Sequence, residues 1–200
     1  SNNGSFNVAL GYETLETNST GNYNTAIGSR ALEANTTAGN QVAVGSNALN
    51  SCTTGIQNVA VGANCLDALT NASNNVAVGF DTLGGCTTGA NSVAVGRSAA
   101  GSVTTGNSNV AIGYYAYSGA TTAGGNTVIG HVAGQGISTG NDNVVIGNNV
   151  DTSSGTDNTS ITIGLNIDGI GSNYFTFGTA GHRVYNQFTS NASWTRSSDV

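Results

Sequence analysis

A glycine recurs every 17 residues through most of this 200-residue chain. Its copies follow one another without insertion or deletion, at Gly11, Gly28, Gly45, Gly62, Gly79, Gly96, Gly113, Gly130, Gly147 and Gly164. A fixed period is the signature of a repeat architecture, in which each unit stacks on its neighbours to build a continuous core. The chain is therefore expected to be a solenoid with one coil per repeat.

The residues before the glycine predict a short strand. The position directly before it is aliphatic in every copy, as in Ile27 and Val44, and the position two residues earlier is mostly valine, as in Val42. These two columns share one face of a strand, and the column between them faces the other way. That middle column is alanine in the first seven copies, from Ala9 to Ala111. We expect the aliphatic columns to form the core and the flat alanine face to lie against another backbone.

The rest of each repeat predicts a second short strand and a polar turn. Ala31 and Leu32 form the second apolar pair of one coil, and Thr-Thr-Gly at 53–55 marks a turn in another. A polar column four residues before the glycine is mostly asparagine, as in Asn58 and Asn75. We expect these side chains to form a ladder that satisfies backbone groups of the turns.

The predicted fold class is all-β, because apolar spacing typical of a helix is never sustained for three turns. Residues 1–168 are assigned to the β-solenoid of 17-residue coils, and residues 169–200 to a non-repetitive aromatic tip. Parallel neighbours stack about 4.8 Å apart, which makes the solenoid a rod of about 50 Å. Each coil buries little apolar area, and a flat exposed strand face is an aggregation hazard on a monomer. We therefore expect a homotrimer that buries the alanine face around its axis.

Composition excludes two kinds of partner. The chain has 4 basic against 10 acidic residues, whereas nucleic-acid binding relies on clustered Lys and Arg. No apolar run approaches the ~18 residues that span a bilayer, so we expect no membrane insertion. The absence of proline agrees with continuous strand ladders, which proline would interrupt.

The sequence predicts no enzyme, no metal site and no cofactor. On the interpretation that no carboxylate recurs as a column, we expect the solenoid to place no pair for acid–base catalysis, while acids from different coils or chains could still converge. His131 lies in the variable column after the glycine and is expected to face solvent. Cys52 and Cys86 lie two coils apart, about 10 Å and beyond the ~7 Å limit for a disulfide, so with Cys65 they predict free thiols.

Candidate receptor-binding residues lie in two places. Aromatic residues gather after residue 169, and the candidates there are Tyr174, His182, Arg183, Tyr185 and Trp194. Tyrosines that stack on sugars and favour interfaces also cluster in one coil. In that coil Tyr114 and Tyr115 are receptor-binding candidates, bulky filler remains an alternative for Tyr114, and Tyr117 is expected in the core because it replaces a leucine.

The repeat motif Asn-x-Val-Ala-Val/Ile-Gly-x-x-Ala-Leu, as at 58–66, resembles the head repeats of trimeric autotransporter adhesins and the shaft repeats of bacteriophage tail fibres. The resemblance covers about residues 5–168 and implies a left-handed parallel β-roll assembled as a trimer. The strict period favours the phage fibre. The ending at 191–200 resembles the junction before endosialidase-type intramolecular chaperones, which would make Ser198 and Asp199 the cleavage junction.

The expected function is a structural and receptor-binding segment of a viral tail fibre. Its expected partners are two further copies of itself and a bacterial surface glycan or outer-membrane protein. The expected location is the virion tail, after assembly in the host cytoplasm. Two alternatives stay open: a passive fibre spacer, and the head of a trimeric adhesin on the bacterial cell surface.

Overall fold

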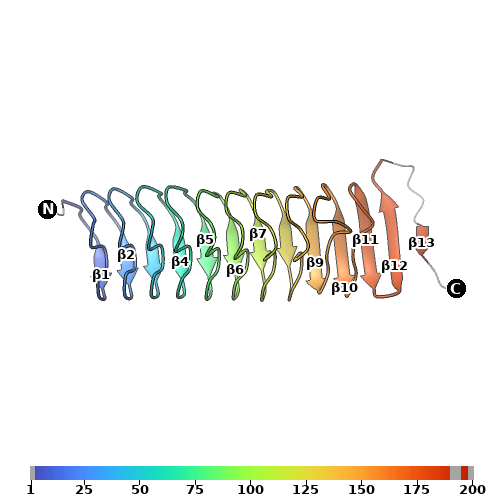
Figure 1. The fold of residues 1–200 in the computed structure, drawn as a ribbon, viewed down its shortest axis with the longest axis horizontal. Coiled ribbons are helices and arrows are strands. Elements are labelled where there is room, and N and C mark those ends of the chain that lie inside the picture. Colours follow the sequence, from blue (N-terminus) through green and yellow to red (C-terminus); the bar gives the residue numbers. More distant parts are fainter. Residues whose placement is uncertain (1–2, 190–194, 198–200) are drawn as a thin grey trace.

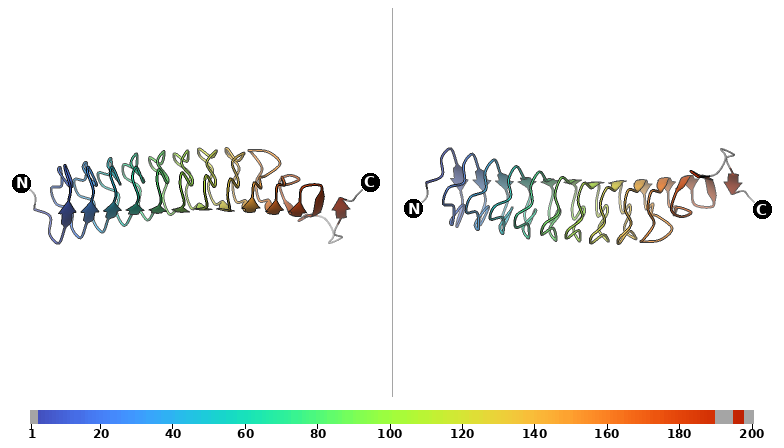
Figure 2. Two further views of the ribbon diagram at one scale, coloured as in Figure 1. Left: turned by 90° about the horizontal axis from the view of Figure 1, so that it is seen from below. Right: turned by 90° about the horizontal axis from the view of Figure 1, so that it is seen from above.

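The computed structural model describes residues 3–189 and 195–197, and every regular element in these ranges is a β-strand (Figure 1). Coil follows coil along one axis to form a rod (Figure 1). The strands lie along one side of the rod and the turn segments along the other, so each coil has a sheet layer and a turn layer (Figure 2). The expected all-β solenoid of 17-residue coils is confirmed.

The thirteen strands form a single sheet in which each strand lies beside the next along the chain. β1 to β11 are parallel, whereas β12 is antiparallel to both β11 and β13. The strands are β1 (Val8–Leu10), β2 (Thr25–Ile27), β3 (Val42–Val44), β4 (Val59–Val61), β5 (Val76–Val78), β6 (Val93–Val95), β7 (Val110–Ile112), β8 (Thr127–Ile129), β9 (Val144–Asn148), β10 (Ile161–Leu165), β11 (Tyr174–Thr179), β12 (His182–Gln187) and β13 (Thr195–Ser197).

The pairing register follows the sequence period as far as β10. Ala43 lies opposite Ala60, its equivalent in the next coil. The last parallel step is shorter, because Ile161 pairs with Phe175 and Thr162 with Thr176. The sheet therefore continues beyond residue 169, through the β11–β12 hairpin to β13.

The alanine column faces the core, which is the reverse of the expected orientation. Ala43, Ala60 and Ala77 are fully buried, whereas 36% of Val61 is exposed. The physical reason is the column of leucines four residues after the repeat glycine, formed by Leu32, Leu49, Leu66 and Leu83. These side chains are buried in the same core cluster and fill the space that faces the sheet. Only a small side chain fits opposite them, so the aliphatic columns point outward. The prediction that these columns form the core is wrong.

The second apolar pair lies in a turn segment, so the prediction of a second strand is also wrong. Arg30 and Leu32 have φ values of +59° and +52°, which are left-handed values foreign to strands. Asn47 and Leu49 repeat them one coil later, at +57° and +51°. Backbone bonding between coils nevertheless continues, since the Leu32 N–H donates to the Ala48 carbonyl at 3.1 Å.

The expected asparagine ladder is confirmed. Asn58 is fully buried, and its Nδ2 donates to the Ala72 carbonyl at 2.9 Å. Its Oδ1 accepts the backbone N–H of Asn75, one coil ahead, at 3.0 Å. Each such side chain closes its own coil and joins it to the next.

The repeat glycine is required at its turn for two reasons. Gly79 has a φ of +136°, which L side chains rarely adopt. A Cβ there would also lie 2.7 Å from the carbonyl oxygen of Gly96. Conformation and close coil stacking therefore both demand glycine in this column.

Tyr117 fills the core where the leucine column is interrupted. It is fully buried, and its hydroxyl donates to the Ala123 carbonyl at 3.2 Å and accepts from Asn126 Nδ2 at 2.6 Å. Burial raises the pKa of this phenol. The expectation that Tyr117 belongs to the core is confirmed.

Candidate functional site

The outward side of the sheet is a largely apolar surface, which we call the aliphatic face. It consists of the columns three and one residues before the repeat glycine, together with their register partners Phe175 and Phe177 on β11. These columns contain no charged residue from Val8 to Phe177. The face is accessible to a partner, since 37% of Val95 and 41% of Phe177 are exposed.

The aliphatic face ends in an apolar hollow of about 680 Å³ beside the β11–β12 hairpin. Ile163, Phe175, Phe177 and Val184 line it. Val184 lies opposite Phe177 in the antiparallel pair, so the hairpin extends the apolar surface by one strand. The rod therefore presents a single apolar surface from β1 to β12.

The hairpin brings some of the predicted receptor-binding residues together but places His182 on its opposite face. The rings of Tyr174 and Tyr185 meet edge to face, with centroids 6.1 Å apart. Arg183 alternates onto the same side of β12 as Tyr185, and its Nη1 donates to the Asp168 carbonyl at 2.9 Å. His182 is exposed and alternates onto the opposite side. The predicted tip cluster is thus divided between the two faces of the hairpin.

Residues directly after the repeat glycine form an exposed stack over four coils, which we call the ridge. The Arg97 guanidinium lies 5.7 Å from the ring centroid of Phe80 and 6.0 Å from that of Tyr114. The His131 ring stacks on Tyr114 at 5.2 Å, with 11° between the planes. His131 is exposed, as expected. Both ring faces of Tyr114 are occupied, so this tyrosine supports its neighbours and offers a ligand only its edge.

Tyr115 differs from Tyr114 because it borders open space. Its ring packs edge-on against Tyr114, with centroids 4.7 Å apart. It also lines a hollow of about 450 Å³ in the turn layer, together with Asp81 and Gln135. Of the two tyrosines predicted in this coil, Tyr115 is the one placed to meet a ligand.

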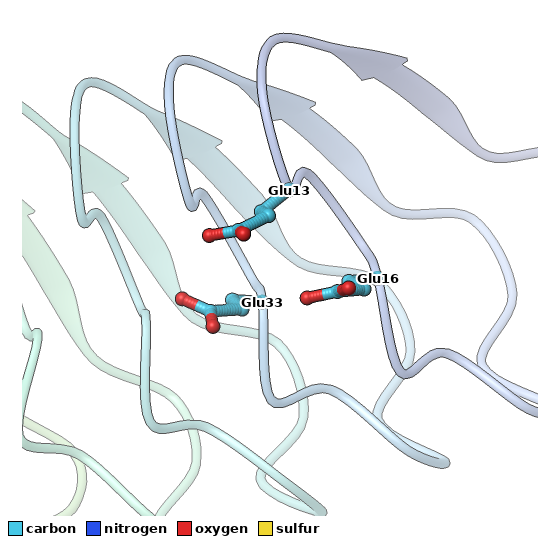
Figure 3. Close-up of side chains that lie close together, drawn as sticks. All are labelled: Glu13, Glu16 and Glu33. Carbon is cyan, nitrogen blue, oxygen red and sulfur yellow. The ribbon is translucent and has the colours of Figure 1, made fainter.

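Three carboxylates converge near the N-terminal end of the rod. Figure 3 shows Glu13, Glu16 and Glu33 lying close together on two adjacent coils, and one carboxylate oxygen of each lies within 4.8 Å of the others. Arg30 Nε lies 2.7 Å from Glu13 Oε2 and 3.8 Å from Glu33 Oε2, and Asn50 Nδ2 donates to Glu33 at 2.7 Å. Two of the carboxylates therefore already have partners, and the cluster is an ion-pair network on the surface.

Electrostatics within this network follow from its contacts. The hydrogen bond from Tyr12 and the interaction with Arg30 lower the pKa of Glu13 against the opposing effect of burial. The same contacts raise the pKa values of Tyr12 and Arg30, in each case chiefly through Glu13.

A second acidic pair occupies one column near the C-terminal end. Asp151 and Asp168 form a parallel backbone bridge between adjacent coils. The Asp151 carboxylate accepts the backbone N–H groups of Gly136 and Thr152. Burial is the main cause that raises the pKa of Asp151, and repulsion from Asp168 adds to it. Together with Glu16 and Glu33, this pair corrects the expectation that no carboxylate recurs as a column.

The three cysteines are free and buried, as predicted. Burial raises the pKa of Cys52 to about 11 and that of Cys65 to about 12. Burial also raises the pKa of Cys86. At neutral pH these thiols are therefore un-ionised core residues.

Trp194 and the predicted cleavage residues Ser198 and Asp199 lie outside the described residues. The part of the chain that the structure describes contains no helix that could cross a membrane. Compared with protein-family models, curated proteins and solved structures, the chain gives no significant match.

Proposed function

We propose that the chain is a structural and receptor-binding segment of a viral tail fibre, which acts as a homotrimer and attaches to a bacterial surface. The aliphatic face is the observation that carries this proposal. Large contiguous apolar patches on soluble proteins mark interaction sites. A rod that carries two outward-facing aliphatic residues on most of its coils therefore needs a neighbour along its length.

Further copies of the same chain are the partner that fits this face. Both aliphatic columns repeat at the coil spacing of about 4.8 Å, so an identical rod offers side chains of matching period. Closed symmetry limits such an assembly to a defined number of copies. Three is the number implied by the resemblance of Asn58–Leu66 to adhesin heads and tail-fibre shafts, and the same resemblance implies the left-handed coil.

Receptor contact is assigned to the places where the uniform repeat gives way to partly exposed aromatic and polar groups. The hairpin supplies the Tyr174–Tyr185 pair and Arg183, and the flank of the rod supplies Tyr115. Three copies of a weak site, held on one rod, give avidity without a deep pocket. The proposed receptor is a bacterial surface glycan or outer-membrane protein.

Two other functions are compatible with the same architecture. A passive spacer would share the trimer and bind no receptor. The head of a trimeric adhesin would bind a receptor from the surface of the cell that made it. The uninterrupted 17-residue period favours the fibre, since adhesin heads typically have shorter and less regular repeats.

The test is binding of the fluorescently labelled chain to a panel of Gram-negative bacterial strains. We expect binding to at least one strain, and a loss of about tenfold when Tyr174 and Tyr185 are both replaced by alanine. Tyr12→Ser, which introduces the residue that Ser29 supplies in the same column, is the matched control at the other end of the rod. Absence of binding to every strain would contradict receptor binding and favour the spacer, and unchanged binding by a folded double variant would contradict the assignment to the hairpin.

A further inference from the structure

A polar hollow lies in the turn layer, away from the hairpin. It has a volume of about 450 Å³ and extends over four successive coils, from Asp81 to Gln135. This volume falls within the ~300–1,000 Å³ of small-molecule sites. Its lining residues belong to the turn segments, which run along the side of the rod opposite the strands (Figure 2). Association through the aliphatic face would therefore leave the hollow open to solvent.

Two successive coils in this part of the rod lack a side chain in one column. The position five residues after the repeat glycine is Glu33, Asn50 and Asp67 in earlier coils, but Gly84 and Gly101 here. A Cβ at Gly84 would collide with the Asp81 carboxylate. Gly84 therefore makes room for that carboxylate, while Gly101 lines the hollow itself and leaves space there for a ligand.

The groups around the hollow offer both hydrogen-bond acceptors and donors. Asp81 Oδ2 accepts from Ser98 Oγ at 3.3 Å and, as a carboxylate, has further acceptor capacity. At the other end Gln135 Nε2 donates to Ser118 Oγ at 3.3 Å, leaving its carbonyl oxygen to accept. The Ser102 hydroxyl also borders the space. This lining suits a ligand that is rich in hydroxyl groups.

One wall of the hollow is aromatic and supported from behind. Tyr115 packs edge-on against Tyr114, whose own ring lies between Arg97 and His131. The ridge thereby fixes the ring that borders the hollow. An aromatic wall provides apolar contact for the C–H face of a sugar ring, while nearby carboxylate, amide and hydroxyl groups bind its hydroxyls.

We propose that this hollow binds a neutral saccharide unit of a cell-surface glycan. The only ionisable groups among its lining residues are the Asp81 carboxylate and the Tyr115 phenol, so an anionic sugar is disfavoured. The site is open and shallow, which makes the expected Kd of one site on the order of 1 mM, with avidity in the assembled fibre. This proposal rests on the proposed receptor-binding function and names the ligand class for one of its sites.

The repeat supplies variants that place a residue where another coil already carries it. Gly101→Asn fills the hollow with the side chain that Asn50 has in the same column, and Gly101 has no left-handed φ that would forbid it. Tyr115→Asn removes the aromatic wall and follows Asn64. Glu33→Asn introduces the same residue in the column of Gly101, several coils away, and is the matched control.

The experiment is saturation-transfer NMR on the full chain with galactose, mannose, N-acetylglucosamine and sialyllactose, followed by titration of whichever sugar responds. We expect a response to at least one neutral sugar, a weaker one to sialyllactose, and a Kd about tenfold higher for Gly101→Asn and Tyr115→Asn than for Glu33→Asn. No response to any of the neutral sugars, or an unchanged Kd in both folded variants, would overturn the proposal.

Cell binding separates this proposal from the proposed function. If the chain binds bacteria and both hollow variants retain full binding without any sugar response, the hollow is excluded and the fibre function stands. If the neutral sugar binds in the hollow but the chain binds no bacterial strain, the hollow stands and the receptor-binding function is contradicted.

Discussion

The side chain of Asn75 accepts a hydrogen bond from the backbone of Ser92 in the next coil, where a backbone carbonyl would otherwise be the acceptor. Asn75 Oδ1 accepts the Ser92 N–H at 3.0 Å, while its Nδ2 donates to the Gly89 carbonyl at 2.9 Å. All these groups lie inside the rod, where an unpaired polar group is costly. The polar column is therefore part of what holds successive coils together.

Replacing Asn75 by alanine is expected to lower the free energy of unfolding by about 1–3 kcal/mol, because it leaves two buried backbone groups without partners. Denaturant titration followed by circular dichroism measures this change. Asn75→Ser, which introduces the residue that Ser92 supplies in the same column, is expected to lose less. Equal stability of the alanine variant and the parent would show that the ladder contributes nothing.

The last coils contain two buried hydroxyls that the described residues do not satisfy. Thr162 Oγ1 and Thr176 Oγ1 have no hydrogen-bond partner there, although earlier coils carry alanine or valine in this column. Thr162→Val, which copies Val145, keeps the shape and removes the hydroxyl. We expect a gain of about 1–2 kcal/mol in the free energy of unfolding. A loss of stability in thermal and denaturant unfolding would mean that the hydroxyl is bonded.

Thiol chemistry tests the position of the cysteines. Burial raises the pKa of Cys52 to about 11 and that of Cys65 to about 12, so neither forms appreciable thiolate near neutral pH. With a chromogenic thiol reagent we expect almost no reaction of the native chain, and reaction of all three cysteines in denaturant. Rapid labelling of the native protein would place the cysteines outside the core.

Stability should vary with pH through Asp151. Its pKa is raised in the folded state, mainly by burial, so the folded chain binds this proton more tightly than the unfolded chain. Its contribution to stability is complete below the unfolded pKa of about 3.9 and is lost as pH rises through the folded pKa.

The comparison with Asp151→Asn isolates that contribution, because the variant has no proton to bind at this position. The free energy of unfolding of the parent, minus that of the variant, is expected to increase as the pH falls from about 7 to about 4. Unfolding titrations at several pH values give this difference. A difference that stays constant or decreases on acidification would contradict the assignment.

The sequence predicts the period, the strand and the ladder because each of them depends on one column with one physical role. A glycine that closely stacked coils require, an amide that bonds to the next coil and a strand flanked by polar turns recur at every step. Aligning the 17-residue repeats with one another is sufficient to find them.

The orientation of the strand could not be predicted in the same way. A period of two defines two faces without saying which one is inside. Larger side chains on one face suggested that this face formed the core, but Leu49 and its equivalents occupy that space from the turn layer. Those leucines adopt a left-handed backbone, with φ of +51° at Leu49. Local preference argues against that conformation for leucine.

The paired acids and the hollow can both be recognised in the aligned repeats. Glu16 and Glu33 are one period apart, as are Asp151 and Asp168. Gly84 and Gly101 are adjacent members of a column that carries larger polar side chains in all the coils before them. What the sequence cannot give is the depth of the hollow and the support of Tyr115 by Tyr114, because these depend on three-dimensional packing.

Association through the aliphatic face is the central claim, and the mass of the chain in solution tests it most directly. Sedimentation equilibrium is expected to give about three times the chain mass of 19.8 kDa. The double substitution of Val78 and Val95 by lysine, which places charge on partly exposed positions of that face, is expected to shift the mass to that of one chain. Ser46→Lys, on the exposed column after the repeat glycine, should leave the trimer intact. A mass close to the 19.8 kDa of one chain for the parent, with the rod folded, would contradict the account.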